Sequence, residues 1–193
     1  ESDRFVPHFH IPLQSGSDVM LKKMRRRYDS NLYQSRIETI KDVMPDACIG
    51  VDVIVGHPGE TEEEFMKTYQ FLNELPVSYL HVFTYSERPN TTAVREKDAV
   101  IPVPERRKRN KMLTILSEKK KRAFYQQFQG TTRNVLFEHE NKNGFMFGYS
   151  DNYLRVRIPF NERLSGNIAS TELSNLADDG IFEGEVLMVQ KTV

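Results

Sequence analysis

The segment that most constrains the fold is the near-continuous apolar run ACIGVDVIVG at residues 47–56. A β-rich run of this kind is typical of a parallel strand that is covered on both faces. Two further strands are expected at about 6–13 and 77–86, and helical patterns separate the three. Strands that alternate with helices predict a parallel α/β sheet with right-handed crossovers.

The helices are predicted from capping residues and apolar stripes. Ser17 can accept a backbone N–H bond as the N-cap of a helix over about 18–27. Thr61 and Glu64 form a capping box at the start of another helix. Between these two lies a helical pattern over about 31–44. Its apolar residues are expected to share one buried face: Leu32, Tyr33, Ile37, Ile40 and Met44.

The character of the sequence changes after residue 103. Pro104 is expected to open a helix of about 104–127. Five strand-like segments follow: RNVLFEH, GFMFGYS, YLRVRIPF, GNIASTEL and FEGEVLMVQ. They predict a small OB-like β-barrel, so the fold class is α/β plus all-β, in domains 1–128 and 129–193. Three parallel strands are half of a usual α/β barrel, and we expect the other part on the N-terminal side.

Side chains alternate across each expected strand, and the two faces differ in character. In the central strand Val51, Val53 and Val55 share one face, opposite Asp52 and Ile54. The outer strands likewise pair an aliphatic face with a polar or aromatic one. A buried Asp without a partner costs about 1–3 kcal/mol or more. The polar faces therefore either line a pocket for a polar ligand or form a self-satisfied hydrogen-bond network.

Several kinds of site are disfavoured by the sequence. His8 and His10 have metal-ligand spacing, but no carboxylate or thiol completes a set. Cys48 is interpreted as a core residue, and a single cysteine excludes an internal disulfide framework and fits a reducing cytoplasm. The segment GHPGE lacks the Lys-Ser/Thr ending of a Walker loop. No apolar run approaches the roughly 20 residues of a membrane span.

The zero net charge of the chain hides an uneven distribution. The balance is −4 over residues 1–103, +7 over 104–128 and −3 over 129–193. The basic excess lies in ERRKRNKMLTILSEKKKR, residues 105–122. Such a segment is either a solvated helix face or a contact surface for the phosphates of a nucleic acid.

Three blocks, HIPLQSGSDVMLKKMRRRY, DVIVGHPGETEEEF and HVFTYSERPNTTA, together resemble the tRNA methylthiotransferase family of radical S-adenosylmethionine (SAM) enzymes. The tail, with GFMFGYSDNYLRVRI, is similar to the TRAM domain that ends these enzymes. The blocks are most similar to the MtaB branch, which implies methylthio transfer to C2 of N6-threonylcarbamoyladenosine at position 37 of tRNA. The near alternative is the MiaB branch, which acts on isopentenyladenosine at that position. Ser15 stands where the ribosomal-protein-modifying branch usually has His.

The resemblance implies a (β/α)6 partial TIM barrel, of which this chain would hold the C-terminal half, followed by the TRAM barrel. It also implies a [4Fe–4S] cluster that cleaves SAM to a 5′-deoxyadenosyl radical, and a second cluster that handles the sulfur. Each cluster typically takes three cysteine thiolates from the protein. One cysteine cannot supply them, so this chain is expected to bind neither cluster and to catalyse nothing by itself.

Site residues are implied by the same resemblance. Contacts to SAM are expected from Gln14, Ser15, Ser17, Ile54, Gly56, Glu60, Phe83, Tyr85 and Ser86. Asp52 and Arg88 are the candidates for a catalytic role, by fixing SAM or the target base. Two positions depart from the family pattern: His57 stands where Phe is usual, and Asn90 where Gly is usual. Asn tolerates the left-handed geometry that such a loop glycine adopts.

The tail carries the candidates for RNA contact, since OB-like barrels stack unpaired bases on aromatic rings and hold phosphates with Lys or Arg. These candidates are Arg133, Tyr149, Tyr153, Arg155 and Arg157. Tyr and Arg at alternating strand positions are equally typical of ordinary surface pairs. The implied partner is a tRNA anticodon stem-loop. The rival interpretation is a stand-alone RNA-binding module without catalysis.

Overall fold

The computed structural model describes residues 5–87 and 100–190. It divides into two compact units: Phe9–Lys121, and the described parts of Glu1–His8 and Arg122–Val193. The predicted domain division into 1–128 and 129–193 stays a prediction. No described helix combines the length and the hydropathy that crossing a bilayer requires.

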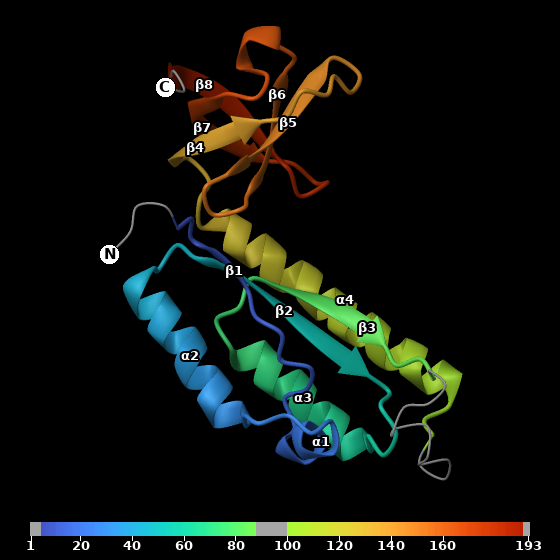
Figure 1. Ribbon diagram of the computed structural model, residues 1–193. Coiled ribbons are helices and arrows are strands. Elements are labelled where there is room, and N and C mark those ends of the chain that lie inside the picture. The colour runs from blue at the N-terminus through green and yellow to red at the C-terminus, as the bar shows by residue number, and fades with distance from the viewer. Residues whose placement is uncertain (1–4, 88–99, 191–193) are drawn as a thin grey trace. The chain divides into compact units, whose positions relative to one another are not determined.

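The first unit is built on a three-stranded sheet with the strand order β1-β2-β3 (Figure 1). β2 and β3 pair in parallel over six residue pairs. The backbone after β1 continues beside β2, because Ile11 donates to the carbonyl of Gly50 at 2.9 Å and Gln14 forms a parallel bridge with Val53. The elements are β1 (His8–His10), α1 (Asp18–Lys23), α2 (Ser30–Val43), β2 (Cys48–Val55), α3 (Glu62–Glu74), β3 (Tyr79–Thr84) and α4 (Val103–Gln126).

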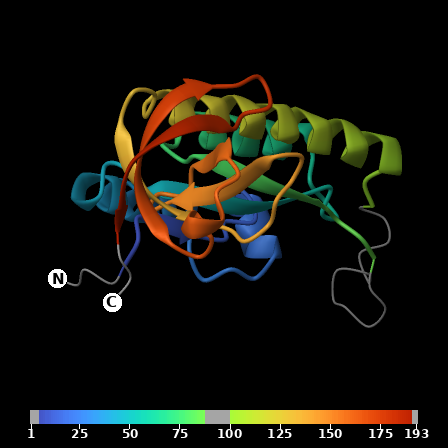
Figure 2. The same ribbon diagram turned by 90° about the horizontal axis from the view of Figure 1, so that it is seen from above.

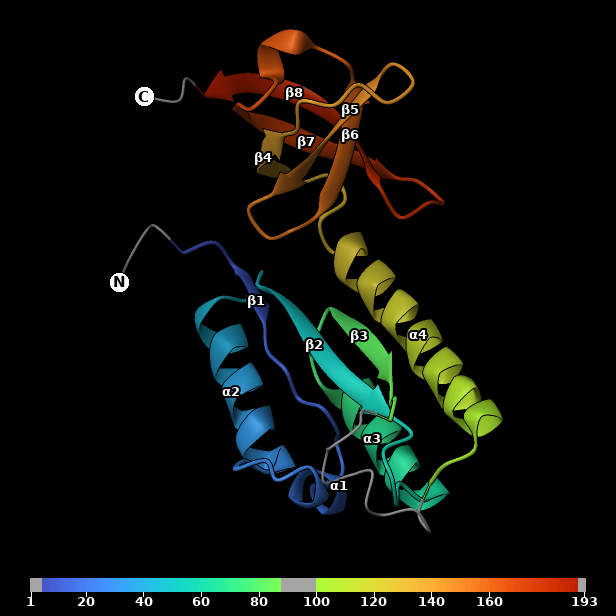
Figure 3. The same ribbon diagram turned by 45° about the vertical axis from the view of Figure 1, so that its right-hand side comes forward.

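The hydrophobic core of this unit lies on the aliphatic face of the sheet. Val51, Val53 and Val55 are fully buried, which confirms the predicted alternation along β2. Three helices contribute side chains to the same core: Ile37 from α2, Phe65 and Leu72 from α3, and Leu113 and Leu116 from α4. In the view of Figure 3, α2 is drawn next to β1, α4 next to β3, and α3 between these two helices. The polar face of the sheet is left outside this core.

Each of the first three helices starts at a side-chain cap. Ser17, Asp29 and Thr61 adopt extended backbone geometry and accept bonds from the N–H groups of Met20, Leu32 and Glu64. The two caps predicted from the sequence, Ser17 and Thr61, are confirmed. These bonds satisfy backbone donors that the first turn of a helix leaves without an intrahelical partner.

The helix predicted over 18–27 is shorter than expected, since α1 ends at Lys23. Arg25 has a φ of 56°, in the left-handed region. Its N–H donates to the carbonyl of Lys22, and the N–H of Arg26 donates to the carbonyl of Leu21. This bond pair is a Schellman motif, which ends a helix and usually places glycine at the left-handed position.

The predicted buried face of α2 is correct in its centre and wrong at its start. Tyr33 and Ile37 are buried, and Ile40 packs against the core. Leu32 is 44% exposed, because the first turn of α2 directs it away from the core cluster. Apolar periodicity gives the direction of a face but not how far the core extends along it.

The second unit holds a closed barrel with the strand order β4-β5-β6-β8-β7. All five predicted strands are present: β4 (Thr132–Phe137), β5 (Phe145–Ser150), β6 (Arg155–Pro159), β7 (Ile168–Leu176) and β8 (Phe182–Gln190). Between β6 and β7 lies the short 3-10 helix η3 (Glu162–Leu164). Closure pairs β4 with β7 in antiparallel and β6 with β8 in parallel orientation. Figure 2 gives a second view of these strands, coloured from gold to red.

The last turn of α4 is part of the barrel core. Tyr125 stacks on Phe182 at a ring-centroid distance of 5.7 Å, and its hydroxyl accepts a bond from the N–H of Arg155 at 3.1 Å. Phe124 and Phe128 are buried beside it. The helix end therefore fixes β6 at the start of that strand.

Candidate functional site

The polar face of the sheet carries a chain of imidazole, carboxylate and aromatic groups. His10 on β1 lies 2.6 Å from Asp52 on β2, measured from Nε2 to Oδ1. The His10 ring also lies 5.0 Å from the ring of His81 on β3. Ile54 and Phe83 are register partners one step further along. The Phe83 side chain is 53% exposed, so this face can be reached from solvent.

Both sequence interpretations of the polar face find support in this geometry. Asp52 has His10 as a hydrogen-bond partner, as a self-satisfied network requires. The pair is nevertheless accessible, with side-chain exposures of 44% for His10 and 21% for Asp52. An accessible imidazole–carboxylate pair beside an exposed aromatic ring can bind a polar ligand that also carries a ring.

The carboxyl end of β2 is held to α4 by a buried ion pair. Glu60 is fully buried, and its Oε2 accepts bonds from the Gly56 N–H at 2.7 Å and from Arg109 at 2.8 Å. Burial raises the pKa of Glu60, against the lowering effect of these two donors. Among the described residues, Glu60 Oε1 and the Tyr85 hydroxyl are the buried side-chain atoms without a hydrogen-bond partner.

Gly56 is required here by a protein side chain. Its φ is 76°, and an added Cβ would lie 2.4 Å from Cγ of Arg106. Arg106 uses that space to donate to the carbonyls of Tyr85 at 2.9 Å and Ile101 at 2.7 Å. The His57 ring meets the Tyr85 ring edge-on at 5.4 Å. The expected approach of a cofactor to Gly56 stays a prediction beside this role.

The serines of the QSGS loop face the helical layer. Ser15 is fully buried, and its hydroxyl lies 2.9 Å from that of Thr68 on α3. The Ser17 hydroxyl donates to the carboxylate of Glu64, also on α3. Because both hydroxyls are engaged in this layer, contacts from this loop to a ligand on the sheet face would have to come from its backbone or from Gln14.

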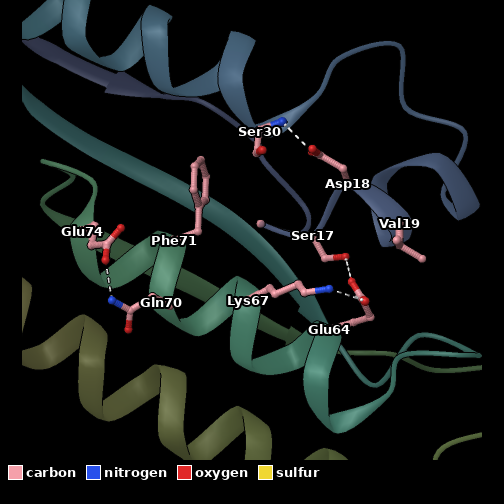
Figure 4. Close-up of a pocket in the computed structure, with 10 residues that line it drawn as sticks. Ser17, Asp18, Val19, Ser30, Glu64, Lys67, Gln70, Phe71 and Glu74 are labelled. Atoms are coloured by element: carbon pink, nitrogen blue, oxygen red, sulfur yellow. Dashed lines mark hydrogen bonds and ion pairs between the residues drawn. The ribbon is translucent and has the colours of Figure 1, made fainter.

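A pocket of about 460 Å³ lies between α1 and α3, with Ser17 on its wall (Figure 4). On its α3 side Lys67 pairs with Glu64 at 2.9 Å, and on the other side Asp18 accepts a bond from the Ser30 N–H at 2.8 Å. Ser17 is the one predicted site residue among those that line it. The pocket was missed in the sequence because its lining comes from segments up to 58 residues apart, from Gly16 to Glu74.

The predicted SAM residues, together with the catalytic candidate Asp52, thus fall into three groups. Ser15 and Ser17 lie under α3; Asp52, Ile54 and Phe83 share the open sheet face; Gly56, Glu60 and Tyr85 lie at the strand ends near α4. Ser86 is exposed beyond β3, and Gln14 is buried beside β2. Arg88, the second catalytic candidate, and Asn90 lie outside the described residues. The cofactor contacts, and the catalytic roles of Asp52 and Arg88, stay predictions.

An iron–sulfur cluster does not fit the side chains present. Cys48 is buried at the start of β2, and no group of three or more metal-ligating residues occurs in the described parts of the chain. Burial raises the pKa of the Cys48 thiol to about 11, which disfavours the thiolate that such a cluster binds.

The three arginines predicted to contact RNA already have acidic partners. Arg155 forms two parallel bonds with Glu138, at 2.9 and 2.8 Å. Arg157 pairs with two other acidic residues, Asp179 at 2.7 Å and Glu183 at 3.0 Å. Arg133 lies 3.8 Å from Asp151.

The predicted tyrosines are stacked within the same unit. Tyr153 lies between the rings of His8, at 3.9 Å, and Tyr149, at 4.6 Å. The guanidinium of Arg155 covers the Tyr149 ring at 4.4 Å. Their role in RNA contact stays a prediction.

Sequence reasoning missed two aromatic residues on the outer face of β5. Phe147 lies 5.1 Å from the Arg155 guanidinium, and Phe145, 43% exposed, lies 5.9 Å from that of Arg157. Their positions, two and four residues before Tyr149, place all three rings on one strand face. That spacing in GFMFGYS was the available signal.

The basic segment of α4 divides into structural and exposed charges. Arg106 and Arg109 are buried in ion pairs, and Lys120 donates to the carbonyls of Asn73 and Leu75 at the end of α3. Burial lowers the pKa of Lys120. Six basic residues of the segment are exposed: Arg107, Lys108, Lys111, Lys119, Lys121 and Arg122.

Comparison with known proteins gives consistent matches. Residues 2–72 match the model of the radical SAM superfamily. The chain is 38% identical over 176 residues to the threonylcarbamoyladenosine tRNA methylthiotransferase MtaB of Bacillus subtilis, covering 89% of this chain and 39% of that protein. It is 35% identical over 188 residues to the tRNA-2-methylthio-N(6)-dimethylallyladenosine synthase of Symbiobacterium thermophilum, covering 96% and 40%. The chain is a relative of the radical SAM tRNA methylthiotransferases.

The predicted resemblance to this family is thereby confirmed, and so is the fold class: part of a radical SAM barrel followed by a TRAM-like closed barrel of five strands. A solved structure, coproporphyrinogen III oxidase of Escherichia coli, aligns with 63% of this chain and 26% of that one, at 22% identity and a TM-score of 0.44. The chain spans about two fifths of the length of the methylthiotransferases that it matches.

Proposed function

We propose that this chain is part of a tRNA methylthiotransferase that adds a methylthio group to C2 of N6-threonylcarbamoyladenosine at position 37. The observation that carries this proposal is the similarity along 89% of the chain to a relative of that name. A second relative of the same name, from Aquifex aeolicus, is 37% identical over 155 residues. A relative of the dimethylallyladenosine type is 35% identical, which is below these two values but above the 33% of a third relative of the first name, from Thermotoga maritima.

The dimethylallyladenosine substrate of the MiaB type is the second candidate, because relatives of that type align over up to 98% of the chain. A non-catalytic RNA-binding module is the third. The closed barrel, with its arginines and aromatic rings on one outer face, supports this reading independently of any reaction.

The open sheet face fits SAM in its chemistry. Asp52 with His10 would hold a polar part of the cofactor, while Ile54 and Phe83 would contact its adenine. Beside a cluster held by other parts of a longer protein, bound SAM would supply the radical chemistry of this enzyme class. The thiolates for that cluster and for a second one have to come from outside the described residues, since Cys48 is the one cysteine of the chain. We infer that the chain is inactive by itself.

The proposed substrate partner is the anticodon stem-loop of a cytoplasmic tRNA. The exposed basic residues of α4 and the arginines of the barrel are the groups that would hold its phosphates. Their contribution is tested separately below, because RNA contact and methylthio transfer can fail independently.

The test is mass analysis of tRNA nucleosides from a strain in which the gene is deleted. We expect the 2-methylthio form of N6-threonylcarbamoyladenosine to disappear and to return when the intact gene is restored. Restoring the gene with Asp52→Asn should leave the nucleoside depleted, whereas Asp42→Asn, at an exposed position of α2, should restore it. Loss of the dimethylallyl nucleoside instead would favour the second candidate, and an unchanged nucleoside profile would contradict both.

A further inference from the structure

On the outer face of β5 and β6, two arginines are paired with carboxylates from other parts of the barrel. Glu138 follows β4 and holds both arms of the Arg155 guanidinium. Glu183, the register partner of Arg157 on β8, holds that arginine together with Asp179 from the loop before β8. The arginines lower the pKa of Glu138 and of Glu183, so both pairs are ionised at neutral pH.

We propose that these carboxylates occupy, in the free protein, the positions that RNA phosphates take in the complex. RNA binding is then an exchange, in which a phosphate replaces Glu138 on Arg155 and another replaces the acidic pair on Arg157. This inference rests on the proposed tRNA function. It adds that the protein's own carboxylates compete with the RNA and so limit its affinity. Carboxylates and phosphates use the same two-pronged guanidinium geometry, which makes the exchange sterically simple.

Exchange of a carboxylate for a phosphate costs little, but for the same reason charge alone gives little affinity. The carboxylates of Glu138, Asp179 and Glu183 are about half exposed, so water can solvate each of them when a phosphate displaces it. A phosphate gains a guanidinium but leaves a carboxylate unpaired, so the net gain from charge is small. Binding then depends on additional contacts, and Phe145 and Phe147 lie beside the two arginines where an unpaired base can stack. The face is therefore selective for RNA with unstacked bases.

Salt dependence distinguishes exchange from simple attraction. A lysine or arginine that neutralises one phosphate of single-stranded RNA contributes about 0.7 to the slope of log affinity against log salt. Where a carboxylate is displaced at the same time, it takes up a cation as the phosphate releases one. Arg155 should then contribute little to the slope in the natural protein. Once Glu138 has lost its charge, Arg155 should contribute the full value of about 0.7.

The experiment compares Glu138→Gln with Glu140→Gln in the whole chain. Glu140 is exposed and pairs with Lys142 at 3.0 Å, so it gives the same change in net charge away from Arg155. The probe is a fluorescent anticodon stem-loop transcript, titrated at several salt concentrations. We expect Glu138→Gln to raise affinity about two- to five-fold, the factor that an exposed ion pair is worth, and to steepen the slope by about 0.7. Glu140→Gln should change neither quantity by a comparable amount.

A third variant assigns the effect to the arginine. In an Arg155→Gln background, Glu138→Gln should give no gain, and thermal unfolding of all variants checks that the barrel is intact. Equal effects of Glu138→Gln and Glu140→Gln, or a gain that persists without Arg155, would overturn the exchange while leaving RNA binding in place. Failure of every protein, natural and variant, to bind the stem-loop would overturn both the exchange and the RNA part of the proposed function.

Discussion

Single side chains show most clearly what the sequence could and could not predict. The alternation of Val51, Val53 and Val55 with polar residues predicted the buried face of β2, because strand geometry alone fixes it. The partner of Glu60 was not predictable, since Arg109 lies 49 residues further along the chain and is brought to it only by the tertiary structure. For the same reason, the basic segment of α4 was read as one surface although two of its arginines are buried.

At the residue scale, Arg109→Met should strongly destabilise the first unit. The variant leaves the Glu60 carboxylate buried with one donor fewer, a change that typically costs about 3–5 kcal/mol. Because loss of Arg109 raises the folded-state pKa of Glu60 further above its unfolded value, protonation favours the folded variant. The loss should therefore shrink as pH falls through that pKa. Urea unfolding at pH 7 and pH 5 measures it, with Arg107→Met as an exposed control expected to change stability by less than about 0.5 kcal/mol.

At the scale of elements, the sequence predicted where helices start better than where they end. The caps Ser17 and Thr61 are local signals, since a hydroxyl bonds a backbone N–H two or three residues later. The end of α1 was placed four residues too late, because Arg25 adopts the left-handed geometry that a glycine would have signalled. All five barrel strands were predicted, since Gly, Asn and Asp mark the turns between them.

Removing the cap of α3 tests this reading of the helix starts. Thr61→Ala deletes the hydroxyl that accepts the Glu64 N–H, and we expect a loss of about 1 kcal/mol in the free energy of unfolding. Thr39→Ala is the matched control. Its hydroxyl bonds the Ser35 carbonyl within α2, where alanine is the better helix former, so stability should stay equal or rise slightly. A similar loss in both variants would contradict the role of the cap.

At the scale of the whole molecule, the change in sequence character after residue 103 predicted the two kinds of architecture. Periodicity separates a helix-covered parallel sheet from a small barrel because the two bury their apolar residues at different spacings. The candidate site was predicted less completely. The sequence placed Asp52 on a polar face, but that His10 is its partner depends on the order of the strands.

The uneven charge of the molecule predicts salt-dependent RNA binding. The double variant Arg107→Gln, Lys111→Gln removes two exposed charges of α4. If each neutralises a phosphate, the slope of log affinity for an anticodon stem-loop against log salt should fall by about 1.4. The double variant Lys22→Gln, Arg36→Gln has the same net charge and exposed positions on α1 and α2. Equal slopes for the two would show that Arg107 and Lys111 do not neutralise RNA phosphates, and an affinity that is independent of salt would contradict phosphate contacts altogether.

The burial of Cys48 gives the protein an intrinsic reporter of sheet opening. The thiol is 2% exposed and protonated at neutral pH, so a maleimide reagent can modify it only in molecules whose central strand has opened. We expect labelling of the native protein to be slow and to accelerate with urea in step with the loss of helical circular dichroism. Stoichiometric labelling within seconds in native buffer would contradict this. Because Cys48 reacts slowly, a cysteine engineered at the surface, for instance in the barrel, can be labelled with a dye selectively.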